Sequence, residues 1–473
     1  MDARTETAPL ADGLQTPRRY WAWAAIILAI GLSVLDGSIA NVALPTIAAE
    51  FQASPSVSIW IVNGYQLAIV VALLPMSALG EIYGYRRIYL AGIAIFAVAS
   101  AACMLAGSLA ELTAARVVQG LGAAGMMSVN TALLRYTVPS RSFGMAIGVN
   151  AIAVASAATA GPTIAGFILT WASWPWLFAF NLPLGVVAIA MGWFSLPESD
   201  RSARPFDWKS AVLSALTVGL FITFIDSIGH RLPLPLIAGQ GAALVVFGTL
   251  LARRELGMAD PMLPLDLLGL PIFSLSIATS IASFVAQMLA FVSLPFTLQT
   301  IMGYSPRDVG LLMMPWPLAI AVVAPIAGFL SDRHSPALLG GAGLALLAAG
   351  LTLLALLPAD ASVADIVWRM VLCGAGFGLF QTPNNRTMIG AAPKRRSGAA
   401  SGMLSTARLT GQTTGAALVA MLLAHLGIAG ATWALGLGAC FAALASLLSL
   451  SRIGLFRQAG QRRNAGDDFA QFP

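Results

Sequence analysis

Asp36 is an acidic side chain inside a long apolar stretch, with no other charged residue between Arg19 and Glu50. A carboxylate there costs roughly 2.5–3.5 kcal/mol even on a lenient insertion scale, so it must be paired, hydrated or protonated. Because a carboxyl group can be charged in one state and neutral in another, Asp36 could carry a proton. A structural, hydrogen-bonding role is the alternative.

Two arginines also place a charge inside an apolar stretch. Arg116 lies about one turn inside its apolar stretch, where it could reach the interface along its own stem or pair with Glu111. Arg408 lies near the middle of another stretch and must face protein or water. It could balance Asp36, or it could fix its own helix in place.

Other patterns that look like motifs carry no chemistry here. Residues 120–125 spell G-x-G-x-x-G, but the segment follows no strand and is apolar, which argues against a dinucleotide site. The chain has no G-x-x-x-x-G-K-[ST] loop, and its three histidines and three cysteines lack metal-binding spacing. We therefore expect no metal site, no cofactor and no enzymatic activity.

The elements that must position these groups are long apolar helices. Hydrophobic residues make up 58% of the 473 residues and charged residues only 10%, against about 25% charged in soluble domains. The apolar runs do not alternate as strands of a membrane barrel would, and each is long enough to cross a bilayer as a helix. We predict fourteen spans, at 20–46, 58–78, 88–108, 112–134, 142–170, 175–195, 209–229, 233–252, 271–299, 308–331, 337–357, 364–390, 397–424 and 429–451.

The basic residues indicate the orientation of these spans. With the N-terminus in the cytoplasm, 21 of the 26 Lys and Arg residues lie on the cytoplasmic side, two lie outside and three lie within spans. This asymmetry follows the positive-inside rule and places both termini in the cytoplasm. Topology thus explains the formal net charge of +6, and no nucleic-acid partner is needed.

The chain repeats itself at an offset of about 250 residues. Gly120, Gly122 and Asn130 recur 254 residues later as glycine, glycine and asparagine, and three glycines from Gly144 to Gly161 recur at the same offset. The spacing predicts two parallel, homologous six-helix bundles at 1–195 and 271–452, a linker with two additional helices at 196–270 and a cytoplasmic tail at 453–473. Transporters built this way bind substrate between two rocking halves.

Four segments resemble the fourteen-helix drug/proton antiporter branch of the major facilitator superfamily. Residues 35–45 are similar to its first-helix signature, 77–87 to the superfamily loop between helices 2 and 3, 116–122 to the fourth-helix arginine motif, and 157–166 to the fifth-helix antiporter motif. In the loop, Ser77 stands where glycine is usual and Glu81 where aspartate is usual; Ala157 and Ala165 replace glycines of the fifth-helix motif.

The resemblance assigns roles to several residues. The family arginine that matches Arg116 is tied to proton transfer, so Asp36, Arg116 and Arg408 form the expected proton-coupling set, driven by the proton gradient. Loop charges on the cytoplasmic side are expected to form ion pairs that close a gate, and small residues of the fifth helix to form a tight or flexing seam. These gate and motif residues are Glu81, Gly84, Arg86, Arg87, Asp332, Gly161, Pro162 and Gly166.

Aromatic, amide and methionine side chains mark the expected substrate site. Family helices 2, 5, 10 and 12 border a central cavity, aromatic faces attract organic cations, and methionine surfaces adapt to varied shapes. The candidates are Trp60, Asn63, Tyr65, Asn150, Met314, Trp316, Gln381 and Asn384.

We expect a monomeric, proton-coupled exporter of small lipophilic cations such as drugs or biocides, in the inner cell membrane. An exporter of one endogenous metabolite or lipid is the alternative. A lipid-modifying enzyme would need acidic or histidine clusters at a membrane face, which we do not find. A channel fits the internal repeat and its single buried carboxylate less well than alternating access does.

Overall fold

The computed structural model describes residues 13–139, 142–199, 201, 205–229, 232–258, 265–331, 333–358, 360–391 and 397–464. Every regular element in these ranges is helical. The first part of the chain forms α1 (Arg18–Glu50), α2 (Pro55–Ser58), α3 (Trp60–Tyr83), α4 (Tyr85–Met104), α5 (Leu109–Thr137), α6 (Phe143–Trp171), α7 (Pro175–Ala179) and α8 (Asn181–Ser195). The remainder forms α9 (Trp208–Gly229), α10 (Leu234–Leu256), η2 (Leu265–Gly269), α11 (Pro271–Phe296), η3 (Thr297–Ile301), α12 (Pro306–Met313), α13 (Pro315–Leu330), α14 (Pro336–Ala355), α15 (Val363–Ala391), α16 (Ser397–Leu426) and α17 (Ala429–Asn464).

Thirteen helical segments within the described residues are long and apolar enough to cross a membrane. The 29-residue α6, part of which lies outside the described side chains, supplies a further long helix. The prediction of an all-helical membrane protein is therefore confirmed. One boundary differs: α17 continues to Asn464, beyond the expected start of a tail at 453.

Proline explains where predicted spans break into two helices. The span that begins near 308 divides at Met314, because Pro315 cannot donate a backbone hydrogen bond to the preceding turn. The span at 175–195 has a similar joint at Phe180, between α7 and α8. Both joints leave the two pieces in contact, so each pair still crosses as one unit.

The repeat detected in the sequence is also a repeat of helix packing. A Cβ atom at Gly120 of α5 would overlap the backbone of α3 at Tyr65, and one at its repeat mate Gly374 of α15 would overlap the backbone of α13 at Trp316. Small residues at these positions let the helix backbones approach closely. Both halves therefore use a glycine at the equivalent position to bring two helix backbones into close contact.

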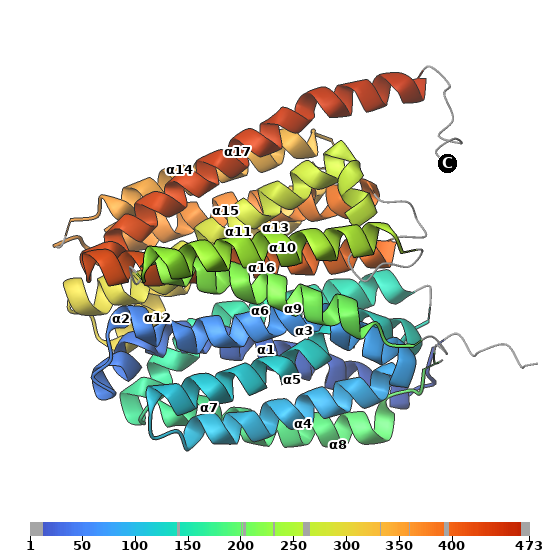
Figure 1. Cartoon of the computed structure of the whole chain (residues 1–473), viewed down its shortest axis with the longest axis horizontal. Helices are drawn as coiled ribbons and strands as arrows, with labels where there is room; N and C mark the ends of the chain where they lie inside the picture. The colour runs from blue at the N-terminus through green and yellow to red at the C-terminus, as the bar shows by residue number, and fades with distance from the viewer. Residues whose placement is uncertain are drawn as a thin grey trace, which may run out of the picture.

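The two halves lie side by side with their helices nearly parallel (Figure 1). Helices α9 and α10 cross the outside of this junction: α9 contacts α3 of one half and α16 of the other, and α10 packs on α9. The first described helix begins, and the last one ends, at the same end of the bundle, which we call the termini end. The opposite end is the far end.

Candidate functional site

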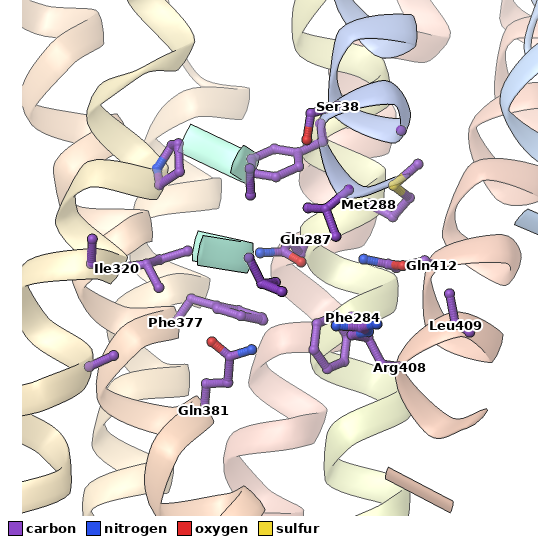
Figure 2. Close-up of a pocket in the computed structure, with 18 of the residues that line it drawn as sticks. Ser38, Phe284, Gln287, Met288, Ile320, Phe377, Gln381, Arg408, Leu409 and Gln412 are labelled. Carbon is purple, nitrogen blue, oxygen red and sulfur yellow. The ribbon is translucent and has the colours of Figure 1, made fainter. Parts of the chain in front are cut away.

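A cavity of about 680 Å³ lies between the two halves, within the size range of small-molecule sites. Its walls come from α1, α3, α5 and α6 on one side and from α11, α13, α15 and α16 on the other. Figure 2 shows side chains from several of these helices pointing into the space. The described lining includes four aromatic rings and six amides, which are Tyr65, Phe284, Phe291, Phe377, Asn41, Gln66, Gln287, Gln381, Asn385 and Gln412.

The halves pack tightly against each other at the far end. A Cβ atom at Gly166 of α6 would lie 2.8 Å from the carbonyl oxygen of Pro306, at the start of α12. The amide of Gln299 donates a 3.0 Å hydrogen bond to the carbonyl of Val42 across the same boundary. One apolar core joins both halves there, whereas largely separate cores fill each half nearer the termini. The cavity therefore opens toward the termini end.

Asp36 and Arg116 form a buried ion pair inside the first half. Asp36 is 2% exposed and Arg116 is fully buried. The Oδ2 atom of Asp36 accepts a hydrogen bond from Nη1 of Arg116. Its Oδ1 atom accepts from the amide of Gln119 at 3.1 Å and from the amide of Asn181 at 2.6 Å. All three partners of the carboxylate are donors, so in this conformation the site fits the ionised form of Asp36.

Arg116 makes further contacts besides its pair with Asp36. Its Nε atom donates to the carbonyl of Ile61 at 3.1 Å, and Nη1 also donates to Oε1 of Gln119 at 2.5 Å. The guanidinium lies 4.0 Å from the ring centroid of Tyr65, in cation–π range. Tyr65 also lines the cavity and donates a 3.0 Å hydrogen bond to the carbonyl of Ser33. Its ring thus separates the ion pair from the cavity.

This arrangement decides between the alternatives that the sequence left open. Arg116 pairs with Asp36 and not with Glu111, whose carboxylate accepts from the backbone of Gly107. Asp36 is not among the described residues that line the cavity in this conformation, so any link between its proton and a substrate must pass through other side chains.

Arg408 stands apart from this pair. It lines the cavity from α16, and the described residues give it no hydrogen bond or ion pair. The idea that Arg408 balances Asp36 between the halves is therefore wrong in this conformation, because Arg116 already does so.

The fifth-helix motif lies where α6 meets two neighbours. A Cβ atom at Gly161 would overlap the side chain of Ser38 on α1, and one at Gly310 of α12 would overlap the carbonyl of Pro162. With Gly166 against Pro306, these contacts make this part of α6 the seam between the halves at the far end.

Two of the loop residues predicted as a gate, Gly84 and Arg86, have their described contacts within their own half. Gly84 has a φ of 99°, a conformation that favours glycine, and it ends α3. Arg86 donates to the carbonyl of Trp193 and pairs at 3.8 Å with the exposed Glu198. Glu81 is half-buried near the end of α3, and Arg87 is exposed. Asp332 lies outside the described residues, so the gate stays a prediction.

Two of the eight predicted substrate contacts, Tyr65 and Gln381, line the cavity. The other six do not line it within the described residues: Trp60, Asn63, Asn150, Met314, Trp316 and Asn384. Trp316 is buried behind the wall, with its ring 5.1 Å from that of the lining residue Phe291.

Two of the three amides among these six have hydrogen-bond partners away from the cavity. Asn384 accepts a 2.8 Å hydrogen bond from the buried Arg452, and Asn150 donates to Asn130. Asn63 is fully buried, and its side-chain atoms have no partner among the described residues. The lining predicted from residue types is therefore wrong at these positions.

Several residues of the ion-pair site went unrecognised in the sequence. Gln119 follows Arg116 by three residues, on the same face of a helix, and this spacing could have identified it. Asn181 is the only amide or charged residue in the span 175–195, another available signal. Ser100, which accepts from Gln119 at 2.8 Å, lies in a helix with no such signal.

A membrane bundle of two repeat-related halves around a central cavity, with a buried ion pair beside it, defines a transporter and not an enzyme. The chain belongs to the Major Facilitator Superfamily, whose family model matches residues 26–409 and 275–466. It is 52% identical to the uncharacterized transporter YebQ of Escherichia coli K12, over 94% of this chain and 97% of the relative.

More distant relatives carry more specific names. The riboflavin transporter RibZ of Clostridioides difficile strain 630 is 32% identical over 81% of this chain and 84% of its own length. The multidrug efflux pump LfrA of Mycolicibacterium smegmatis is 32% identical over 85% of this chain and 81% of its own length. The solved structure of a bacterial homologue of the lysosomal transporter Spinster shares the fold, with a TM-score of 0.70 at 15% identity, covering 94% of this chain and 99% of that one.

Proposed function

We propose that this protein is a proton-coupled exporter that exchanges protons for an amphipathic organic molecule by alternating access. The observation that carries the proposal is the donor environment of Asp36 in a conformation open at the termini end. The arginine asymmetry of the sequence supports a cytoplasmic position for this end, in a bacterial inner membrane. No bound cofactor is required, because the proton gradient supplies the energy.

The donor environment gives the direction of coupling. A protonated Asp36 would carry an O–H donor, yet Arg116, Gln119 and Asn181 all present donors to its oxygens. Protonation would also leave Arg116 as a buried cation without its counterion, which is strongly unfavourable. In the state open to the cytoplasm Asp36 is therefore ionised, and it takes up its proton only when the helices around it rearrange. That order matches proton entry from outside and proton release inside.

Tyr65 supplies the connection between proton and substrate. One part of its ring contacts the guanidinium of Arg116, and another part lines the cavity. A substrate that displaces the ring would change the surroundings of the ion pair without touching Asp36. Coupling would thus pass through a contiguous contact of three side chains.

The cavity and the relatives support an organic substrate of moderate size. About 680 Å³ lined by phenylalanines and amides suits a planar, partly polar molecule. The name of LfrA favours drug export, and the name of RibZ favours the second candidate, export of one specific endogenous metabolite. Substrate breadth separates the two: a drug exporter accepts many unrelated ring systems, and a metabolite exporter accepts one.

The test uses the purified full chain in proteoliposomes with an imposed pH gradient and a panel of charged and neutral dyes. Wild-type protein should accumulate at least one dye only when the gradient is present, and Asp36→Asn should lose this dependence. Asp365→Asn is the matched control, because Asp365 is a half-exposed carboxylate away from the cavity. Gradient-driven transport at the wild-type rate by Asp36→Asn would refute the proposed coupling.

A further inference from the structure

The central cavity contains one described charged side chain, and that side chain is a cation. Arg408 lies eleven residues after the start of α16 and lines the cavity. No aspartate or glutamate is among the described lining residues. The carboxylate of Asp36 is already neutralised by Arg116, which lies against the ring of Tyr65. The described wall of the cavity thus has a net positive charge.

Arg408 also has no hydrogen-bond or ion-pair partner among the described residues. Its Nε atom is buried with no hydrogen bond, and no described residue forms an ion pair with its guanidinium. An unpaired cation at this depth is unfavourable, and arginines in such positions normally bind a counterion, face water or bind a ligand. Arg116 shows how this chain satisfies a structural arginine, with a carboxylate, a carbonyl and an amide oxygen as acceptors. The described surroundings of Arg408 contain nothing comparable, so its donors are available to water or to a ligand in the cavity.

The neighbouring side chains complete a recognition site. Gln412 lies one helical turn from Arg408 on α16, and Gln381 faces them from α15 (Figure 2). Phe284 and Phe377 pack edge to face at 5.3 Å between their centroids and line the same space. A planar guanidinium binds carboxylates and similar anions through two parallel hydrogen bonds, while the phenylalanine rings offer an apolar surface to a flat ring system.

We propose that Arg408 is the substrate-recognition residue of this cavity and that the transported molecule is a planar aromatic compound with an anionic group. This inference rests on the proposed function, in that it takes the central cavity as the transport site. It departs from the lipophilic cation expected from the sequence, because a cationic group in this cavity would be repelled by Arg408 and would find no described carboxylate.

The experiment compares two dyes that share one ring system and differ in charge, fluorescein (anionic) and rhodamine 123 (cationic). Binding to the purified full chain in nanodiscs is measured by fluorescence polarisation, with no pH gradient. Wild-type protein should bind fluorescein more tightly than rhodamine 123. Arg408→Gln should weaken fluorescein binding by about 10- to 100-fold, the usual effect of losing hydrogen bonds to a charged group, without weakening rhodamine 123. Arg408→Lys should recover part of the fluorescein binding, because it keeps the charge but not the two-pronged geometry.

Arg333→Gln is the matched control, because Arg333 is an exposed cation in the loop between α13 and α14 and does not line the cavity. It should change neither affinity. Tighter wild-type binding of rhodamine 123 would overturn the proposal, as would an equal loss of both dyes in Arg408→Gln. Because binding needs no gradient, charge-selective binding without pH-driven transport would refute the coupling alone. Gradient-driven transport that is unchanged by Arg408→Gln would refute only the role of Arg408 in substrate recognition.

Discussion

The buried pair of Asp36 and Arg116 should show strong energetic coupling in a double-mutant cycle. Asp36→Asn replaces a carboxylate with an amide that has one acceptor oxygen, although three donors point at this position. Removing one member of a buried pair costs about 3–5 kcal/mol, because the other charge stays buried. Arg116 would keep the carbonyl of Ile61 and Oε1 of Gln119 as acceptors, so we expect the lower end of the range, about 3 kcal/mol.

The second single variant and the double variant complete the cycle. Arg116→Gln leaves Asp36 with the amides of Gln119 and Asn181 and should cost a similar amount. The double variant contains neither charge, so its cost should fall below the sum of the two by about 2–3 kcal/mol. The measurement is the unfolding free energy of the purified chain in mixed micelles, titrated with a denaturing detergent.

A matched pair in the other half provides the control. Arg369 is the repeat mate of Arg116, and it pairs at 3.8 Å with Asp365, whose side chain is 45% exposed. A cycle on Asp365 and Arg369 should give a coupling below about 1 kcal/mol, as exposed pairs do. If the Asp36 and Arg116 substitutions are additive within about 0.5 kcal/mol, the pair does not stabilise this conformation and the argument for coupled protonation fails.

Three further predictions follow from the seam, the ring and the α9–α10 hairpin. Gly161→Leu should abolish dye efflux although the protein reaches the membrane in normal amounts, because any side chain at this position overlaps Ser38. Pro162→Ala should reduce efflux less. Equal effects of the two substitutions would contradict the role of α6 as the seam. Tyr65→Phe should retain most pH-driven transport, because the ring still covers Arg116. Tyr65→Ala should transport independently of pH. Transport by Tyr65→Ala that still depends fully on the pH gradient would refute the role of the ring. Partial burial acts to raise the pKa of Asp207, but hydrogen bonds from Ser210 and Arg254 outweigh it and hold this pKa below its usual value. The contact between Asp207 and Arg254 should therefore be complete at neutral pH and be lost only as the pH falls through the lowered pKa. The protection of the amides of residues 206–210, measured by hydrogen exchange and corrected for the intrinsic pH dependence of the exchange rate, should therefore fall in wild type only below about pH 4. It should not change with pH in Asp207→Asn, and a loss of protection near pH 6 in wild type would contradict this.

The overall architecture could be predicted because it depends on local properties of the chain. A run of about twenty apolar residues must form a helix in a bilayer, since only a helix satisfies its own backbone groups there. The constant offset between Gly120 and Gly374 exposed the repeat, and the structure packs both glycines against equivalent helices. Asp36 and Arg116 could be singled out for a similar reason, because an ionised group in an apolar run is conspicuous without any knowledge of its neighbours.

The partners of those groups and the walls of the cavity depended on the tertiary structure. Asp36 and Arg116 are 80 residues apart, and nothing in the sequence distinguishes Arg116 from Arg408 as the counterion. In a helix of a soluble protein the apolar face identifies the side that packs on the core. In a membrane both the lipid and the protein interior are apolar, so periodicity does not show which side of a helix faces the cavity. That is why residue type placed Trp316 and Asn384 in the cavity, whereas the packing of the helices buries one behind the wall and pairs the other with Arg452.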